Sequence, residues 1–339
     1  MYRTRHLFPG SNTANGFVGF FGELKKDIRR TVILKGGPGV GKSTLMGKAG
    51  RHYEKKGMEV TYFHCSGDPD SLDAVRVPEA GFLMVDGTAP HIMDPALPGA
   101  ADGILNLGEC LDEKQLECQA EEIRELTQDI SRCFAQAYRY LSSALSIRKD
   151  AEAVYALALP EKEKQLLSRQ LAALLPAGEA GGEAHAFAQA ITWKGEAQYV
   201  DALLTDTVYC LDVPWGFDAD ALLRPVWEEA KNRGLQRSAY HDPLDPERLR
   251  HITVGNAAFT TAVLMDAPVF APELDARVIS RENSRLSFDR AAYELMRDQA
   301  VEALFQAKEK HDRLERYYID AMDYDRLEEM GERCLKKLP

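Results

Sequence analysis

Residues 36–43 bring glycines, a lysine and a serine together in the order Gly-Gly-Pro-Gly-Val-Gly-Lys-Ser. This order satisfies the pattern G-x-x-x-x-G-K-[ST] at every required position. Glycines let backbone N–H groups turn inward around phosphate oxygens, Lys42 can reach terminal phosphates as a mobile point charge, and the Ser43 hydroxyl can ligate magnesium. The loop therefore predicts that the chain binds a nucleoside triphosphate, with contacts from Gly36, Gly37, Pro38, Gly39, Val40, Gly41, Lys42, Ser43 and Thr44.

The segments on either side of this loop fit the same interpretation. The apolar run 31–34 predicts a strand that leads into the loop, and residues 43–56 can follow as a helix. Such a helix directs its free N–H groups and its partial positive charge at a bound phosphate. The motif in this context resembles the P-loop NTPase superfamily. The alternative interpretation of the motif is a glycine-rich turn with only a structural role.

Two further strands are expected at 58–65 and 81–86, the second more fully buried, in a sheet of parallel strands with a helical crossover. P-loop proteins usually place a magnesium-holding carboxylate at the end of such an apolar strand. The resemblance thus implies Asp86 as a metal residue beside Ser43, and Lys42 and Asp86 as the catalytic residues. The alternative for Asp86 is a turn residue paired with Gly87.

Many ATPases of this superfamily carry a glutamate directly after that aspartate, but this chain has Gly87 there. A water molecule could instead be oriented by one of several residues, none singled out by its spacing: Asp68, Asp70, His91, Asp94 or Glu109. His64 and His91 are favoured as structural histidines, since a lone histidine carries little information. We therefore expect nucleotide binding with slow hydrolysis.

Composition narrows the class of protein. The 339 residues, 45% hydrophobic, favour two globular domains, and no apolar run is long enough to cross a bilayer or resembles a secretion signal, so a cytoplasmic location is expected. The six cysteines show no metal-ligand spacing, so neither zinc nor a disulfide is expected. A formal net charge of -11 makes nucleic acid an improbable partner.

The second half of the chain resembles the first. A shift of 177 positions lays residues 34–72 on 211–249 without a gap and matches eight identical residues. In the second copy of the loop, residues 213–220, Ala219 replaces the lysine, and Asp218 and Asp220 would repel phosphates. We therefore expect an internal duplication with a P-loop nucleotide-binding domain at 1–175, a linker at 176–184 and a degenerate domain without a nucleotide site at 185–339.

Each half also contains a long stripe of apolar residues spaced alternately by three and four, at 123–147 and at 296–321. This spacing predicts long coiled-coil-like helices, packed either as a hairpin within each half or as a pair between the halves. Arg132 and Arg139 share one helix face and could reach a triphosphate if the helix acts as a lid; the sequence does not decide this.

Together these features resemble an uncharacterised bacterial family of tandem P-loop ATPases, although members carry a phosphate-binding loop in both halves. The resemblance implies an α/β fold of two P-loop NTPase-like parallel-sheet units, with ATP and Mg²⁺ as cofactors. The first hypothesis is a Mg-dependent, slow ATPase whose nucleotide state changes the packing of the two halves.

Two alternatives stay open. One is a kinase for a small molecule or nucleotide, with an acceptor pocket at 68–73. The other is a nucleotide-dependent switch or scaffold that scarcely hydrolyses and binds a protein partner, or a second copy of itself, through the helical stripes. The sequence does not separate ATP from GTP.

Overall fold

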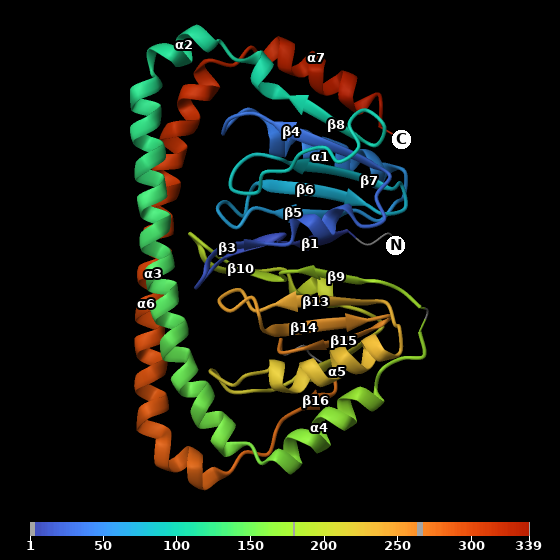
Figure 1. The fold of residues 1–339 in the computed structure, drawn as a ribbon, viewed down its shortest axis with the longest axis vertical. Helices are drawn as coiled ribbons and strands as arrows, with labels where there is room; N and C mark the ends of the chain where they lie inside the picture. The colour runs from blue at the N-terminus through green and yellow to red at the C-terminus, as the bar shows by residue number, and fades with distance from the viewer. Residues whose placement is uncertain (1–3, 179, 263–266, 339) are drawn as a thin grey trace.

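The computed structural model describes residues 4–338, apart from 179 and 263–266. Two similar units, each built on a six-stranded sheet, lie one above the other, and a pair of long helices runs along one side of both (Figure 1). The α/β class expected from the sequence is confirmed.

The first unit has strand order β1-β5-β6-β7-β4-β8, and all its strands are parallel except β6. A two-stranded hairpin, β2–β3, lies beside this sheet. The strands are β1 Arg5–Leu7, β2 Gly10–Thr13, β3 Gly16–Gly19, β4 Arg30–Lys35, β5 Thr61–His64, β6 Leu72–Val77, β7 Phe82–Asp86 and β8 Asp102–Asn106. The helices are η1 Phe21–Lys25, α1 Lys42–Lys55, η2 Leu107–Cys110 and α2 Glu113–Cys118, where η marks a 3-10 helix.

The second unit repeats this plan with strand order β9-β13-β14-β15-β12-β16, again with one antiparallel strand, β14. Its strands are β9 Glu183–Ala186, β10 Gln189–Thr192, β11 Gly195–Gln198, β12 Thr207–Leu211, β13 Arg237–His241, β14 Leu249–Val254, β15 Ala257–Thr260 and β16 Val269–Phe270. Its helices are η3 Val200–Leu203 and α5 Asp220–Asn232. Each strand of the first sheet therefore has a counterpart in the second.

The expected parallel sheets are found in part: most strands are parallel, but β6 and β14 run antiparallel to their neighbours. Residues 65–71 make a tight turn, closed by hydrogen bonds from Ser71 N to Asp68 O (2.8 Å) and from Cys65 N to Ser71 O (3.0 Å). The chain then returns along β5 as an antiparallel neighbour before β7 begins. A sheet of mostly parallel strands with one reversed strand is the result.

The long helices α3 Ala120–Ala158 and α6 Ala276–Asp320 run antiparallel and pack along most of their lengths (Figure 1). Of the two arrangements left open by the sequence, the structure has the pair between the halves. Apolar residues of the predicted stripes are buried between them, among them Ile130, Cys133, Ala137, Ala303 and Ala307. Within the described ranges, no helix has a stretch apolar enough to span a lipid bilayer.

The short helix after each long helix packs on the opposite unit. Helix α4 Glu161–Ala173 ends the first half of the chain, yet its Leu167 and Leu171 share a core with α5 of the second unit. Helix α7 Tyr324–Leu335 ends the second half, yet Met330 packs with Val40 and Leu107 of the first unit. At these two helices the packing therefore does not follow the order of the sequence.

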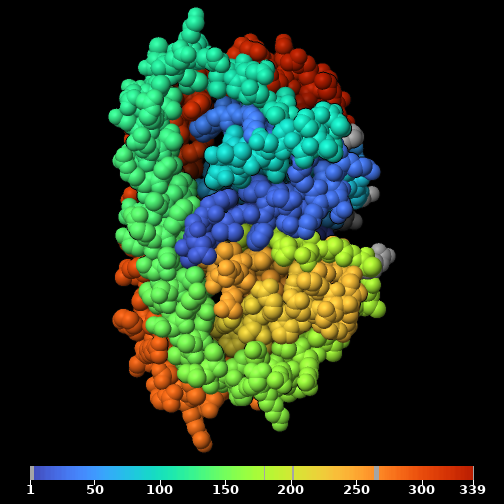
Figure 2. All heavy atoms as spheres, in the orientation of Figure 1, coloured from blue at the N-terminus to red at the C-terminus, as the bar shows by residue number. Residues whose placement is uncertain are grey.

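The two sheets meet at β1 and β9, where the backbones of Phe8 and Phe187 exchange hydrogen bonds of 2.9 and 3.0 Å. Aromatic rings cross the junction in both directions, since Tyr199 packs on His6 of the first unit and Phe20 packs on His185 of the second. Figure 2 shows the blue and yellow-green surfaces in contact along this junction, with α3 beside both. The units form one continuous body.

Candidate functional site

The glycine-rich loop lies between the end of β4 and the start of α1, as predicted. Gly39 (φ 73°) and Gly41 (φ 85°) have left-handed backbone conformations that a side chain would strain, and Gly41 is the N-cap directly before α1. The sequence folds this way because glycine alone meets these two turns without strain.

Lys42 turns back over the loop. Its Nζ donates hydrogen bonds to Gly36 O (2.8 Å) and Gly37 O (2.7 Å) and lies 3.5 Å from Asp86 Oδ2. Only 11% of the side chain is exposed. A bound anion would therefore have to replace loop carbonyls as the partner of this ammonium group.

Asp86 ends β7, which pairs in parallel with β4 so that Asp86 lies opposite Leu34. Because parallel neighbours end at the same edge of a sheet, the carboxylate and the loop meet there. Its Oδ1 accepts hydrogen bonds from Thr88 N (2.9 Å) and Thr88 Oγ1 (2.6 Å), which fix the carboxylate. The second oxygen faces Lys42.

A second carboxylate, Asp73 on β6, lies beside Asp86 and is 5% exposed. Burial and the charge of Asp86 raise its pKa to about 8. Asp73 lies at the end of the segment 68–73 predicted as an acceptor pocket, and no pattern in the sequence distinguishes it from its neighbours. Asp73 could not be told apart from the other aspartates in the sequence because β6 begins directly after an aspartate-rich turn.

His91 also belongs to this cluster. Its Nε2 is 3.8 Å from Asp73 Oδ1, its side chain is 7% exposed, and neither ring nitrogen has a hydrogen-bond partner in the described part of the chain. Burial lowers its pKa to about 4, so the imidazole is neutral at pH 7. A histidine that the sequence favoured as structural thus lies at the site with two unused polar atoms.

The other residues considered for orienting water lie in different settings. Asp68 pairs with Lys308 (3.6 Å), Asp70 with Lys194 (2.6 Å) and Asp94 with Lys35 (3.3 Å). Glu109 is exposed. His64 Nδ1 donates a hydrogen bond to Pro69 O (2.8 Å), and its Nε2 bonds to His6 Nδ1 (2.8 Å), so His64 is part of the framework.

The oxygen donors at the site fit a hard divalent cation. Ser43 Oγ accepts a hydrogen bond from Leu72 N (3.0 Å), so the hydroxyl lies beside the strand that carries Asp73. The neighbouring carboxyl groups of Asp73 and Asp86 lie near Lys42, and such oxygen sets are the ligands that Mg²⁺ prefers. Ser43 and Asp86 were predicted for this role, and Asp73 adds a third donor.

The junction of α6 and α7 covers the loop. A Cβ added to Gly37 would lie 2.5 Å from the Tyr318 ring, and one added to Gly39 would lie 3.1 Å from Ile319. Val40 is buried against Met322 and Leu327. This contact joins residues about 280 positions apart, and no local pattern in the sequence predicts it.

The arginines considered for a lid, Arg132 and Arg139, are both exposed on α3. Arg132 is 72% exposed and pairs with Asp129 (2.7 Å) on its own helix. It is the end of α6, rather than the exposed face of α3, that lies against the loop.

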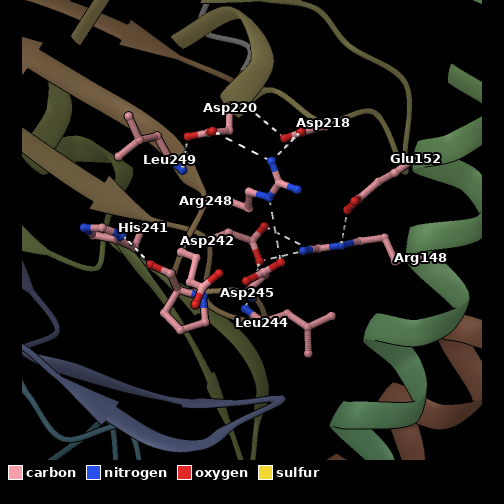
Figure 3. A network of polar contacts seen from close by, with 12 residues as sticks. Arg148, Glu152, Asp218, Asp220, His241, Asp242, Leu244, Asp245, Arg248 and Leu249 are labelled. Atoms are coloured by element: carbon pink, nitrogen blue, oxygen red, sulfur yellow. Dashed lines mark hydrogen bonds and ion pairs between the residues drawn. The ribbon is translucent and has the colours of Figure 1, made fainter. Parts of the chain in front are cut away.

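The region of the second unit that corresponds to this site has the same arrangement of strand and helix but different charged side chains (Figure 3). Leu249 N donates to Asp220 Oδ1 (2.8 Å) as Leu72 N donates to Ser43. Ala219 replaces Lys42, Asp220 replaces Ser43, and Arg250 replaces Asp73. The lysine, the predicted metal residue Ser43 and Asp73 are thus each replaced by a residue of a different kind.

Arginines hold the carboxylates of this second place. Arg248 Nη1 lies 2.8 Å from Asp218 Oδ2, and Arg148 of α3 lies 3.0 Å from Asp242 Oδ1 and 3.2 Å from Glu152 (Figure 3). Burial works against ionisation of Asp242, but Arg148 and Arg250 hold its pKa below the usual value. The network fills the space with paired charges and ties α3 to the second unit.

Comparison of the chain with family models, curated proteins and solved structures gives no match.

Proposed function

We propose that the first unit binds a Mg-nucleoside triphosphate, ATP in the simplest case, at residues 36–44. The observation that carries this proposal is the meeting of Lys42, Ser43 and Asp86 around a glycine-rich loop at the carboxyl ends of two parallel strands. The chain would then be a P-loop NTPase with one nucleotide site.

Each residue has a distinct part in this proposal. Lys42 exchanges its bonds to loop carbonyls for bonds to phosphate oxygens, and the loop N–H groups and the start of α1 bind the remaining oxygens. Ser43, Asp86 and Asp73 hold the magnesium ion, which when bound neutralises charge on the phosphates. His91, with two unpaired nitrogens beside Asp73, is the group placed to orient water.

Hydrolysis is expected to be slow. Position 87 is glycine, so the glutamate that commonly polarises water in this superfamily is missing. The neutral His91 can accept a hydrogen bond but is a weak base. A phosphate-release rate well below that of a dedicated motor ATPase follows.

The cover formed by α6 and α7 supports coupling between nucleotide state and the packing of the two units. Tyr318 and Ile319 press on the loop, and α6 continues along the whole molecule to the second unit. Phosphate entering the loop would displace or reposition this end of α6. The same contact favours the nucleotide switch as a second candidate function.

We infer that the two units arose by internal duplication and that the second lost its nucleotide site. The shared strand order supports this, as do matched hydrogen bonds such as His64 to Pro69 and His241 to Pro246. Substitution of Lys42, Ser43 and Asp73 by Ala219, Asp220 and Arg250 explains the loss.

Phosphate release from ATP tests the proposal. Purified protein with Mg²⁺ should release phosphate, and Lys42→Ala should lower the rate at least about 100-fold, since removing one charge-stabilising donor typically has that effect. Lys48→Ala, a change of an exposed lysine on the same helix, should leave the rate unchanged. Equal rates in wild type and Lys42→Ala would overturn the ATPase, while tight binding without release would favour the switch.

A further inference from the structure

A pocket of about 430 Å³ opens beside the first turns of α1, on the side facing β1 and β5. Ser43 and Thr44 form the end nearest the loop, and Gly47 and Arg51 continue the wall along the helix. His64 and Asp70 line the opposite side. The pocket thus borders the predicted phosphate site but is not part of it.

Gly47 keeps this space open. A glycine in a helix interior costs about 1 kcal/mol relative to alanine, so its presence calls for a reason. At Gly50, one turn along, that reason is packing, because a Cβ there would lie 2.3 Å from Tyr62 Oη. At Gly47 the nearest atom to an added Cβ is Arg51 Nη1 at 3.2 Å, the mobile end of a pocket side chain.

The second unit shows what happens without that glycine. Arg224 occupies the position of Gly47, and its guanidinium bonds to Asp220 Oδ1 (2.7 Å) and Glu247 O (2.8 Å). Trp227 occupies the position of Gly50 and packs on His185 and Arg237. Trp227 thus takes the place that Tyr62 occupies beside Gly50 in the first unit, and Arg224 puts a large side chain where Gly47 has none.

The charges of the pocket favour an anion. Arg51 is in none of the ion pairs found among the described residues, whereas Asp70 is paired with Lys194 of the second unit (2.6 Å). Burial lowers the pKa values of His6 and His64, and their rings bond to each other (2.8 Å). Arg51 is the cation left for a ligand.

We propose that this pocket binds a small organic molecule through a phosphate or carboxylate held by Arg51, beside the nucleotide phosphates. A guanidinium forms two parallel hydrogen bonds with either oxyanion. The binding itself stands independently of the proposed function, while its closeness to a nucleotide rests on it. Lys194 on Asp70 gives the second unit a part in shaping the site.

Calorimetric titration tests this site with the predicted loop blocked by saturating Mg²⁺ and a non-hydrolysable ATP analogue. The probes are AMP, ribose 5-phosphate and citrate, which separate phosphate from carboxylate ligands. At least one probe should bind once per chain with a dissociation constant below about 1 mM. Gly47→Arg and Arg51→Glu should each weaken that binding at least about tenfold.

Lys48→Glu is the matched control, because it makes the same charge change on α1 outside the pocket wall. It should change the affinity less than about twofold, since exposed charges outside the site are screened. Equal weakening by Lys48→Glu and Arg51→Glu, or no binding of any probe, would overturn the proposal. Arg51→Glu alters an exposed residue, so it keeps the test informative if Gly47→Arg unfolds.

A Lys42→Ala protein without nucleotide separates the two proposals. Probe binding should persist there if the pocket is correct. If this variant no longer binds nucleotide but still binds the probe, the defect is confined to the loop and both proposals stand. If it binds nucleotide but not the probe, the pocket proposal is rejected.

Discussion

Lys42 and Asp86 were predicted as site residues from local sequence patterns. Lys42 belongs to a glycine-rich motif, and Asp86 ends an apolar strand. Asp73 was named only as part of the segment 68–73, and His91 only as one of five candidates for orienting water, because their closeness to Asp86 depends on the reversal of β6 and on the turn after β7. A local pattern identifies side chains that a single strand-loop-helix positions. Partners brought together by tertiary packing need the structure.

Asp73→Asn tests whether that residue joins the cation site. The Kd for ATP in the presence of Mg²⁺ should rise about tenfold, because an amide is a weaker magnesium ligand than a carboxylate, while the Kd without Mg²⁺ should stay the same. Asp70→Asn, at an exposed position, is the control for calorimetric titration. An equal rise in both metal conditions would argue for a packing defect.

His251 tests the effect of a buried neutral histidine on stability. It is 1% exposed, accepts from Thr260 Oγ1 (2.7 Å) and bonds to Gln189 Oε1 (3.1 Å), and burial lowers its pKa to about 3. In the unfolded state His251 is protonated below about pH 6.5, whereas in the folded state it is protonated only below about pH 3. Stability therefore falls as the pH drops through this window.

Between pH 7 and pH 5 this histidine should account for about 2 kcal/mol of lost unfolding free energy. His251→Asn should be less stable at pH 7 but should lose about that much less on acidification, as measured by urea unfolding at both pH values. The same pH dependence in wild type and variant would contradict the assignment.

At the scale of elements, periodicity predicted β4, α1 and the two long helices, because each carries a long or strongly patterned apolar face. Periodicity did not predict strands β6 and β14 or the two small hairpins, because apolar and polar residues alternate there over too short a run. The exchange of α4 and α7 between the units was also not predicted, because the sequence of a short amphipathic helix does not indicate which core it packs on.

The link between α3 and the second unit is the element-level contact most open to test. Arg148→Met should lower the unfolding free energy by about 3–5 kcal/mol, because it leaves the buried carboxylate of Asp242 without its main partner. Adding Asp242→Asn should restore part of the loss. Arg132→Met on the same helix, at a 72% exposed side chain, should change stability by less than about 0.5 kcal/mol.

Chemical denaturation of the three variants measures these differences. A loss for Arg132→Met as large as that for Arg148→Met would show that helix α3 itself, and not the ion pair, is responsible.

Across the whole molecule, α6 connects the second unit to the loop of the first, and its end carries Tyr318 and Ile319 onto the glycines. The similar strand order of the two units would by itself make the two loops equivalent. In the second unit α3 covers the corresponding loop, since a Cβ on Gly216 would lie 2.7 Å from Ala151. The different charges of the two loops therefore make the molecule asymmetric in chemistry while its fold stays symmetric. Nucleotide in the first loop is therefore expected to act on α6 and α7 before any other element.

Hydrogen exchange followed by mass spectrometry tests this coupling. Adding Mg²⁺ and a non-hydrolysable ATP analogue should change exchange rates in residues 313–330, which include the contacts with the loop, and leave α5 unchanged. Tyr318→Ala should reduce the change in that segment. Protection confined to the loop and α1 would separate nucleotide binding from helix movement.

The number of nucleotides bound per chain tests the central claim most directly. Equilibrium titration of wild-type protein with a fluorescent ATP analogue and Mg²⁺ should give one site, lost in Lys42→Ala and retained in Arg248→Ala, which disturbs the corresponding place in the second unit. Two sites, or one site that survives Lys42→Ala, would contradict the account.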